Sequence, residues 1–407
     1  MQIRMFVMAV SQLLCVSVRA GMSSGVNGLK RFAYEPGKCA ITISEVINGM
    51  VKTELGMLFG TRARVSQSQL LHYDLYTPLN PEVRQILRPG DLSMLKKSNF
   101  NPKWPVRVSI HGWSGRSDSC SNAAIKDAYL SRGNYNVIIL DWSRQSLDIS
   151  YKRVSKQLPA IAANLAKMLR FLHDNAGVPY ENIYLVGHSA GSHISGLAGK
   201  LLQPQLLGAI FALDPAGLTQ LSLGPSERLS PTDAMYVESI HTDLTLLGNP
   251  SHRLSHASFF TNWGLGQPHC PNATATEFDF VCDHFAALYY FAESVRRPSS
   301  FPALRCGSAA TIRSATCNCR NSSGTSESST EASGRNSTTA SDRHAAMRPT
   351  CRGDQFMGGE PAVQKNGVYY LSTRRQAPYG YDDGMVHMRP PKPSTILQTG
   401  VPKGWLM

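Results

Sequence analysis

The chain has 407 residues, of which 42% are hydrophobic and 17% are charged, and its formal net charge is +13. This balance is that of a soluble globular protein, and it excludes a chain without a buried core. The basic residues are spread along the sequence without interleaved aromatic residues, which argues against a nucleic-acid partner. The charge instead favours anionic lipid or acidic polysaccharide, unless it serves solubility alone.

A secretory signal peptide is predicted over residues 1–20. Arg4 supplies a short basic start, residues 5–18 are largely apolar, and residues 18–20 offer small side chains at the cleavage position. The apolar stretch is shorter than the roughly 20 residues that a membrane span needs. We therefore expect a secreted, extracellular protein whose mature chain opens with an N-terminal extension over residues 21–70.

Cysteine usage agrees with export, because removal of the signal peptide takes Cys15 and leaves an even number of cysteines. We therefore expect four disulfides, formed in an oxidising compartment. The close pair Cys317 and Cys319 lacks the spacing of a zinc site and is followed by no histidine pair, so we expect no metal there. The eight remaining cysteines are Cys39, Cys120, Cys270, Cys282, Cys306, Cys317, Cys319 and Cys351.

From about Val106 to Ile240, apolar runs alternate with helical periods, which is the pattern of a parallel sheet flanked by helices. Between the second and third runs, apolar residues recur at threes and fours from Val154 to Leu172 and predict one buried helix face. Pro159 interrupts this face and marks a late start or a kink. The predicted strands are residues 106–110, 137–140, 183–186, 209–213 and 236–240.

A polar cluster follows each of these five predicted strands. Because ligands bind at the carboxyl ends of the strands in open α/β sheets, we expect the clusters to share one edge of the sheet. The functional site should lie at that edge. The clusters are His111-Gly-Trp113, Asp141-Trp142, Gly187 to Gly191, Asp214 to Gly217 and His241-Thr-Asp243.

The cluster after the third strand, Gly187-His-Ser-Ala-Gly191, carries the chemistry. It matches the Gly-x-Ser-x-Gly nucleophile elbow, in which a serine on a sharp strand-to-helix turn attacks an ester. Residues 21–25 match the same pattern, but no strand precedes them and they directly follow the signal peptide. Ser189 is therefore the predicted nucleophile.

A serine hydroxyl becomes a good nucleophile when a histidine accepts its proton and a buried carboxylate orients that histidine. The two partners should follow the serine in the order acid, then histidine. Asp214 is the favoured acid because it ends the next apolar run, whereas Asp233 and Asp243 lie in segments that look more exposed. The alternative role for Asp214 is a cap of the turn at Pro215.

Five histidines between residues 241 and 284 follow Asp214, and their spacing alone does not choose the base. His284 is favoured because it directly follows Cys282-Asp283 at the start of a helical pattern, so that a disulfide and a helix would hold it rigidly. A rigid base is what the chemistry requires. The five are His241, His252, His256, His269 and His284.

The C-terminal part of the chain contains a segment of different composition. Residues 321–346 are dominated by Ser, Thr, Gly and Ala, so they cannot bury enough surface to fold and predict a disordered insertion. Residues 368–373 alternate like a strand, and residues 382–407 predict an irregular tail. Glycosylation sequons, which predict surface exposure, stand at Asn272, Asn321 and Asn336.

Six motifs in their order along the chain resemble the ordered signatures of the animal pancreatic lipase family. The resemblance implies a single α/β-hydrolase domain over residues 71–381, with a central, mostly parallel sheet flanked by helices. It also implies a catalytic triad of Ser189, Asp214 and His284. The motifs are His111-Gly-Trp113, Gly187-His-Ser-Ala-Gly191, Leu213-Asp-Pro-Ala216, His241-Thr-Asp243, Gln267-Pro-His-Cys270 and Cys282-Asp-His284.

The resemblance further implies an oxyanion hole and a pairing of the cysteines. The oxyanion donors would be the backbone amides of Trp113 and Ala190, and the residue after the nucleophile is where a tetrahedral intermediate needs such a donor. Trp113 could also be a core aromatic residue. The implied disulfides are Cys270–Cys282, Cys306–Cys317, Cys319–Cys351 and, for the remaining two, Cys39–Cys120.

Two loops differ from those of triacylglycerol lipases in this family. The loop between Cys270 and Cys282, at the position of the family's lid, holds only eleven residues, and the loop from His241 to His256 is also short. Short loops at both places are typical of family members that cleave the sn-1 ester of phospholipids. The resemblance therefore favours a phospholipase A1-type enzyme.

We expect neither a metal, a cofactor nor a cofactor protein. Given the length of the sequence, we expect no C-terminal β-sandwich of the kind with which pancreatic-type relatives bind a protein cofactor. The family's calcium loop is eroded, because Ser230 stands where a carboxylate ligand is expected beside Glu227, Arg228 and Asp233. Calcium favours several carboxylate oxygens.

These features predict a secreted serine esterase that hydrolyses glycerolipids at a membrane, lipid-droplet or lipoprotein surface. The short lid favours phospholipid over the alternative substrate, triacylglycerol. A second alternative is a non-catalytic lipid-binding protein, since some yolk proteins keep this fold after losing the serine. The intact set of Ser189, Asp214 and His284 argues against that alternative.

Overall fold

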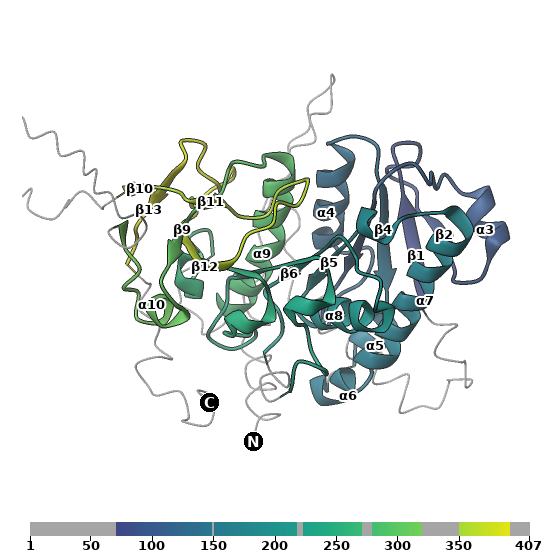
Figure 1. Ribbon diagram of the computed structural model, residues 1–407, viewed down its shortest axis with the longest axis horizontal. Coiled ribbons are helices and arrows are strands. Elements are labelled where there is room, and N and C mark those ends of the chain that lie inside the picture. The colour runs from purple at the N-terminus through teal and green to yellow at the C-terminus, as the bar shows by residue number, and fades with distance from the viewer. Residues whose placement is uncertain (1–70, 149, 218–222, 271–278, 320–349, 391–407) are drawn as a thin grey trace, which may run out of the picture. The chain divides into compact units, whose positions relative to one another are not determined.

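The computed structural model describes residues 71–148, 150–217, 223–270, 279–319 and 350–390 (Figure 1). These residues form a large mixed sheet, a small two-stranded sheet and helices on both faces of the large sheet. The predicted signal peptide, N-terminal extension and Ser/Thr-rich insertion lie outside the described residues. No helix within the described ranges combines the length and the apolar character that a membrane span requires.

The large sheet has the strand order β11-β9-β12-β8-β7-β6-β5-β3-β4-β1-β2. Its seven central strands, from β12 to β4, run parallel, while β1 and β2 at one end and β9 and β11 at the other are antiparallel to their neighbours. This is the central, mostly parallel sheet of an α/β-hydrolase fold, as predicted. The strands are β1 (His72–Tyr76), β2 (Gln85–Leu87), β3 (Val106–Ile110), β4 (Asn136–Asp141), β5 (Ile183–His188), β6 (Ala209–Leu213), β7 (Tyr236–His241), β8 (Ala257–Thr261), β9 (Pro302–Cys306), β11 (Gln355–Phe356) and β12 (Gly367–Leu371).

The long helices cover the two faces of this sheet in pairs. Helix α7 packs on α8 over one face, and α4 packs on α9 over the other. Because parallel crossovers are right-handed, the chain reaches opposite faces when it leaves β3 through α4 and β5 through α8. The carboxyl ends of β3 and β5 therefore form a topological switch point, where α/β folds bind ligands. The helices are α3 (Leu92–Lys97), α4 (Cys120–Leu130), α5 (Ser143–Ser146), α6 (Tyr151–Ser155), α7 (Leu158–Ala176), α8 (Ala190–Leu202), α9 (Asp279–Arg296) and α10 (Ala309–Arg313).

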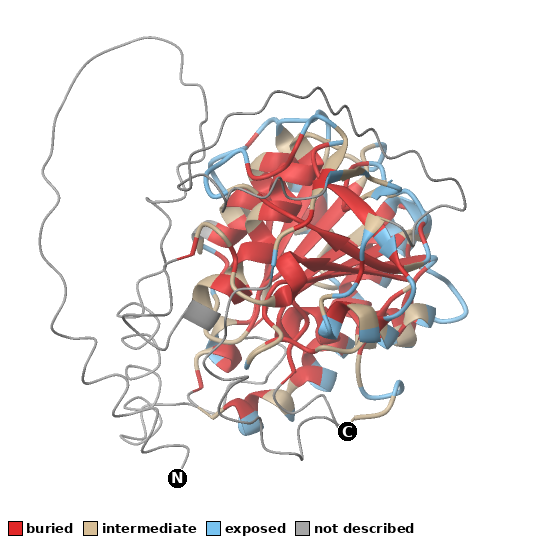
Figure 2. Cartoon of the chain, turned by 90° about the vertical axis from the view of Figure 1, so that its left-hand side faces the viewer, coloured by how far each residue is buried: buried red, intermediate tan, exposed pale blue. Residues whose placement is uncertain are grey.

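The central strands are buried on both faces. Every residue of β3, β4, β6 and β7 is buried, which Figure 2 shows as a continuous red layer through the middle of the sheet. Side chains from both faces of a parallel sheet meet helices, so such strands consist of nearly continuous apolar runs. Strands β4 and β6 follow this rule, whereas β3 and β7 also bury the charged residues Arg107 and Glu238. The five strands predicted from the sequence are confirmed.

The helix predicted between the second and third strands is divided in two. Val154 belongs to α6, and the regular apolar spacing continues in α7. Pro159 lies in the first turn of α7, where its missing amide donor costs nothing, so it marks a start and not a kink. The helix ends at Ala176 and is capped by Gly177, whose φ of 68° suits a residue without a side chain.

Two buried ion pairs connect the segment before β12 to strands β3 and β7. Arg107 on β3 donates two hydrogen bonds to Glu360, and both side chains are 4% exposed. The ammonium group of Lys365 lies 2.9 Å from a carboxylate oxygen of Glu238 on β7. Each buried charge thus has its counter-charge, and the two pairs connect the segment before β12 to β3 and β7.

Residues 382–390 are more regular than the sequence predicts. Residues 382–407 were expected to be irregular, but β13 (Met385–His387) pairs with β10 (Thr350–Arg352) in the small sheet. Val386 is fully buried, so this short strand covers apolar surface. Three residues are too few for an alternating pattern to stand out in a sequence.

Candidate active site

Ser189 occupies the turn between β5 and α8. Strand β5 ends at His188 and α8 begins at Ala190, so the serine alone makes the turn. Its φ of 54° and ψ of −120° are strained for a residue with a side chain, as a nucleophile elbow requires. Its backbone amide donates a hydrogen bond of 2.9 Å to the carbonyl of Leu213, which ties the turn to the end of β6.

The glycines around the serine allow three backbone segments to approach closely. A Cβ atom at Gly187 would collide with the backbone of Gly191, and one at Gly191 would collide with the carbonyl of Ile110. A Cβ atom at Gly112, in the loop after β3, would lie 2.7 Å from the Cβ of Ser189. Larger residues at these positions would therefore push the elbow away from the loop after β3.

Asp214 and His284 form a buried hydrogen bond beside the elbow. The Nδ1 atom of His284, on α9, lies 2.5 Å from Oδ2 of Asp214, the residue that follows β6. The other oxygen, Oδ1, accepts hydrogen bonds from the backbone amides of Thr242 at 2.8 Å and Asp243 at 3.1 Å. The fully buried carboxylate is thus held from two sides and fixes the orientation of the imidazole.

The two atoms that the sequence analysis predicts to react, the serine hydroxyl and the histidine Nε2, have no partner in the described chain. Within the described residues, the Ser189 hydroxyl and the Nε2 atom of His284 make no hydrogen bond. Contacts of this kind often tighten only when substrate is in place. Ser189 is 7% exposed and His284 is 4% exposed, so both face a site that largely excludes solvent.

The other four histidines that the sequence left open have different partners. His241 is fully buried, its Nε2 lies 2.8 Å from the Ser239 hydroxyl, and burial lowers its pKa to about 3. His252 lies in a short 3-10 turn, and partial burial lowers its pKa. Among the described histidines, His284 is therefore the one that Asp214 orients. The remaining contacts are His256 Nδ1 with the amide of Val237 and His269 Nδ1 with the hydroxyl of Tyr290.

Asp243 is fully buried, so the sequence-based expectation of an exposed segment was wrong. Its carboxylate accepts hydrogen bonds of 2.8 Å from the amides of Thr245 and Leu247, which fold the loop after β7 around it. Oxygens of Asp243 and Asp214 and a nitrogen of His284 lie within 4.8 Å of one another. Burial, and then the nearby Asp214, raise the pKa of Asp243. The sequence of the loop after β7 is short and polar, so it does not indicate that Asp243 is buried.

Asp233 is also fully buried, which again corrects the expectation of an exposed segment. The ammonium group of Lys200 contacts its carboxylate and lies 3.0 Å from the Ser230 hydroxyl. The Arg228 side chain donates to two backbone carbonyls nearby, and Glu227 is exposed. Calcium prefers several carboxylate oxygens, whereas this set has one buried carboxylate that already holds an ammonium group. These residues do not fit a calcium ion.

The predicted oxyanion donors lie in backbone that touches the elbow. Neither the amide of Trp113 nor that of Ala190 donates a hydrogen bond within the described chain. The indole nitrogen of Trp113 donates to the Asp148 carbonyl at 2.7 Å, and its ring packs on Tyr151. The Trp113 side chain therefore anchors the loop in the core, while its amide stays available for a ligand.

Two further histidines support the site, a role that their sequence positions did not reveal. The Nε2 atom of His188 lies 3.0 Å from the backbone carbonyl of His284, and the two rings are 4.6 Å apart. His111 stacks on Trp142, and its Nδ1 lies 3.0 Å from the carbonyl of Gly112. Burial lowers the pKa of both His188 and His111 and so disfavours their charged forms. Pattern alone does not separate a supporting histidine from a reacting one.

The structure contains three of the four expected disulfides: Cys270–Cys282, Cys306–Cys317 and Cys319–Cys351. In the first of these disulfides, Cys282 stands two residues before His284, so the bond anchors the start of α9. The pair Cys39–Cys120 lies outside the described residues, because Cys39 and the side chain of Cys120 are not described. The same holds for most of the predicted lid and for Asn272, Asn321 and Asn336.

The amino-acid sequence is similar to those of lipases and lipase-related proteins from vertebrates. Lipase member H from Danio rerio is 32% identical over 246 residues, which cover 60% of this chain and 53% of that protein. Pancreatic lipase-related protein 2 from Mus musculus is 32% identical over 251 residues, 58% of this chain and 52% of that protein. Inactive pancreatic lipase-related protein 1 from Canis lupus familiaris is 31% identical over 266 residues, 60% of this chain and 55% of that protein.

The chain thus spans about half the length of these curated relatives. A family model described as lipase matches residues 50–340, which is more than half of the 407 residues. The match includes the elbow, Asp214 and His284. The chain therefore belongs to the lipase family, together with pancreatic lipase-related proteins and lipase member H.

Proposed function

We propose that the protein is a secreted serine esterase that hydrolyses acyl esters of glycerolipids. Ser189 is the nucleophile, His284 the general base and Asp214 the residue that orients the base. The observation that carries this proposal is the buried Asp214–His284 hydrogen bond of 2.5 Å beside a strained serine at the switch point of the sheet. A buried carboxylate in this role favours the tautomer that accepts a proton at Nε2.

The reaction follows from these positions. His284 Nε2 takes the hydroxyl proton while Ser189 Oγ bonds to the ester carbonyl carbon, and the resulting oxyanion accepts hydrogen bonds from the amides of Trp113 and Ala190. Transfer of the proton to the leaving alkoxide completes the acyl-enzyme. Water then attacks the acyl carbon, with His284 again as base, and releases the fatty acid and the serine.

The substrate proposed is a phospholipid, cleaved in a phospholipase A1-type reaction. The short loop between Cys270 and Cys282 supports this choice, because it has the length that is typical of family members that cleave phospholipids. Triacylglycerol is the competing substrate. Secretion, and action at a membrane, lipid-droplet or lipoprotein surface, belong to the same proposal, which the N-terminal sequence and the net charge of +13 support.

The first experiment compares the wild-type protein with Ser189→Ala on a soluble nitrophenyl butyrate ester. We expect the variant to lose activity by a factor on the order of 10⁶, because no other group replaces the nucleophile. Unchanged turnover in the variant would refute the proposed nucleophile. A folded wild-type protein that hydrolyses no ester but carries bound lipid through purification would favour the non-catalytic alternative.

The second experiment identifies the substrate. The protein is incubated with vesicles that contain both 1-palmitoyl-2-oleoyl phosphatidylcholine, whose two acyl chains differ in mass, and triolein, and mass spectrometry identifies the products. Release of 2-acyl lysophosphatidylcholine supports the phospholipase A1-type reaction. Release of diacylglycerol alone would assign the protein to the neutral lipases, and 1-acyl lysophosphatidylcholine would reverse the proposed position of cleavage.

A further inference from the structure

We infer that a basic surface over α5, α6 and α7 docks the protein on anionic phospholipid membranes next to the active site. This surface, called the basic face, consists of the exposed side chains of Arg144, Lys152, Lys156 and Lys167. The inference rests on the proposed function, because it names the membrane surface on which the protein would hydrolyse its lipid. Exposed cations attract anionic surfaces even before contact.

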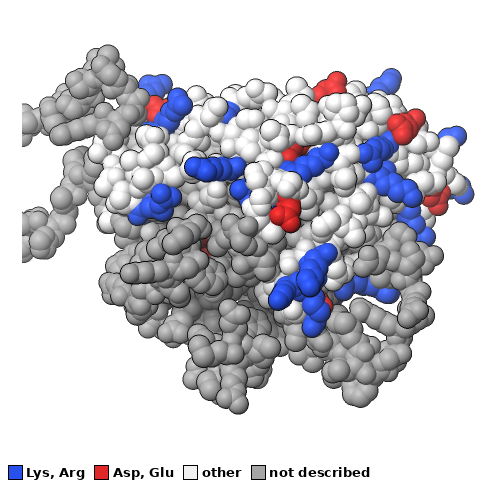
Figure 3. Space-filling model, turned by 60° about the horizontal axis from the view of Figure 1, so that its bottom comes forward, with Lys and Arg blue, Asp and Glu red and all other residues white. Residues whose placement is uncertain are grey.

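The charge of the basic face is not balanced locally. Residues 142–157 contain one carboxylate, Asp148, which is buried and binds Arg153 through hydrogen bonds of 2.8 and 2.7 Å. Within the described chain, the four cations of the basic face take part in no ion pair. In Figure 3, where the lower side of Figure 1 comes forward, Lys and Arg side chains outnumber acidic ones.

The basic face is joined directly to the loop that carries the oxyanion donor Trp113. The Trp113 indole binds the carbonyl of Asp148, between α5 and α6, and its ring packs on Tyr151 at a centroid distance of 5.2 Å. The amide of Ser114 donates to the carbonyl of Ser146 at the end of α5, at 2.9 Å. A membrane bound at the basic face would therefore lie beside the edge where Ser189 meets its ester.

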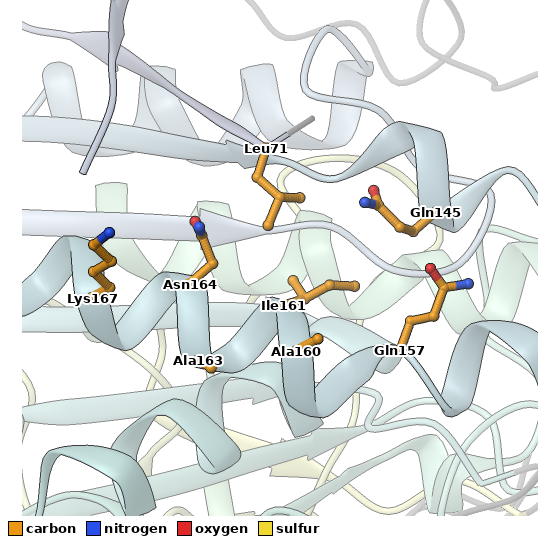
Figure 4. Close-up of a pocket in the computed structure, with 8 residues that line it drawn as sticks. All are labelled: Leu71, Gln145, Gln157, Ala160, Ile161, Ala163, Asn164 and Lys167. Atoms are coloured by element: carbon orange, nitrogen blue, oxygen red, sulfur yellow. The ribbon is translucent and has the colours of Figure 1, made fainter. Parts of the chain in front are cut away.

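The basic face also borders a hollow of about 320 Å³, which is lined by four apolar side chains and by the polar side chains of Gln145, Gln157, Asn164 and Lys167 (Figure 4). Lys167 lines this hollow, while Arg144 and Lys156 each precede a residue that lines it. Cations around hydrocarbon suit a partner that offers anionic groups above acyl chains, which a bilayer does. An acidic polysaccharide offers charge without hydrocarbon, so the hollow favours lipid. The apolar lining residues are Leu71, Ala160, Ile161 and Ala163.

The test measures flotation of the protein with vesicles, in a Ser189→Ala background so that hydrolysis does not alter the lipid. We expect binding to phosphatidylcholine vesicles that contain phosphatidylglycerol, weak binding to phosphatidylcholine alone, and loss of binding at high salt. The triple variant Lys152→Gln, Lys156→Gln, Lys167→Gln should bind about a hundredfold more weakly, because each lysine near an anionic surface contributes roughly a factor of five.

The matched control replaces three exposed lysines at the other edge of the sheet, Lys96→Gln, Lys97→Gln and Lys103→Gln. These residues lie in the segment that leads into the amino end of β3, and their loss should leave vesicle binding nearly unchanged. A second control, Lys152→Arg, Lys156→Arg, Lys167→Arg, keeps the charge and should restore binding. Circular dichroism establishes that each variant is folded.

Equal loss of binding in the two glutamine variants would overturn the inference, since net charge and not the basic face would then be responsible. Binding of wild-type protein to heparin, but not to phosphatidylglycerol vesicles, would overturn it in favour of a polysaccharide. Turnover of the soluble nitrophenyl ester by wild type is measured in parallel. Turnover without vesicle binding refutes the docking surface alone, and vesicle binding without turnover refutes the proposed function alone.

Discussion

The two edges of the large sheet both bury charged groups, but they use them differently. Toward the amino edge, Arg107 and Glu360 satisfy each other through two hydrogen bonds, and the guanidinium lies 3.7 Å from the ring centroid of Tyr184. At the carboxyl edge, Asp214 holds one nitrogen of His284, while the other nitrogen makes no hydrogen bond to the described chain. We call the first set closed, because its charges satisfy each other, and the second set open, because one nitrogen of His284 has no partner in the described chain.

This difference separates groups that stabilise the fold from groups that can react. A closed buried pair gains little net stability, but it becomes costly when one partner is removed. An open set keeps a proton acceptor and hydrogen-bond donors ready for charge that appears only during the reaction. Substitutions at the carboxyl edge should therefore change activity, and substitutions at the amino edge should change stability.

The largest expected effect in this comparison belongs to Asp214→Asn. The amide cannot accept the Nδ1 proton of His284 in the same way, so the imidazole adopts the wrong tautomer and kcat falls on the order of 10⁴-fold. Turnover of the soluble ester measures this loss, and the thermal unfolding midpoint shows whether the fold survives. A decrease of less than tenfold would show that Asp214 is not the orienting acid.

Asp243→Asn is the matched control for that variant. Asp243 is an equally buried carboxylate in the same cluster, but it accepts hydrogen bonds from its own loop and not from His284. We expect it to lose about 1–3 kcal/mol of stability, because the new amide group faces a backbone donor, and to keep most of its kcat. A loss of kcat as large as that of Asp214→Asn would assign the orienting role to both carboxylates.

The next largest effect should come from the amino edge. Arg107→Met leaves Glu360 buried without its partner, which should lower the free energy of unfolding by about 3–5 kcal/mol. Urea unfolding measures this change. The double variant Arg107→Met, Glu360→Leu removes both charges and should recover most of the loss, with ester turnover close to wild type. If the double variant is as unstable as the single one, packing and not charge is the cause.

The smallest effect concerns the buried histidines. Burial lowers the pKa of His193 to about 4 and that of His241 to about 3, below the roughly 6.5 of an unfolded chain. The unfolded chain then binds more protons at acidic pH, so the stability from these residues is complete above about pH 6.5 and is lost as the pH falls toward the folded values. Each contributes a slope of up to about 1.4 kcal/mol per pH unit.

Urea unfolding between about pH 7 and pH 5 tests this dependence. The variant His193→Gln keeps a side chain that can bond the carbonyl of Ala216, as His193 does at 2.8 Å, but it cannot take up a proton. Its stability should therefore fall less steeply with decreasing pH than that of the wild type. Identical slopes for the two proteins would mean that His193 is not kept neutral by burial.

The sequence was sufficient for the parts of the fold that depend on local pattern. Apolar runs located the five strands from β3 to β7, and the residues after each run predicted the carboxyl edge. The elbow could be recognised because two glycines and a serine must stand at fixed positions in a strand-to-helix turn. In each case one short segment contains the whole physical requirement.

Features that depend on packing between distant segments could not be predicted. Burial of Asp243 follows from the folding of its own loop against Asp214. The pairing of Arg107 with Glu360 joins residues 253 positions apart. Nothing in the local pattern of any of these residues reports its partner.

We expect the Asp214–His284 pair to activate Ser189 and no other serine of the chain. A fluorophosphonate probe tests it directly, because an activated serine bonds to phosphorus, its proton passes to the histidine and fluoride leaves. Peptide mass spectrometry should locate one adduct, on Ser189, in the wild-type protein and none in a folded His284→Ala variant. An adduct on another serine, equal labelling of the two proteins, or no labelling of folded wild type would contradict the account.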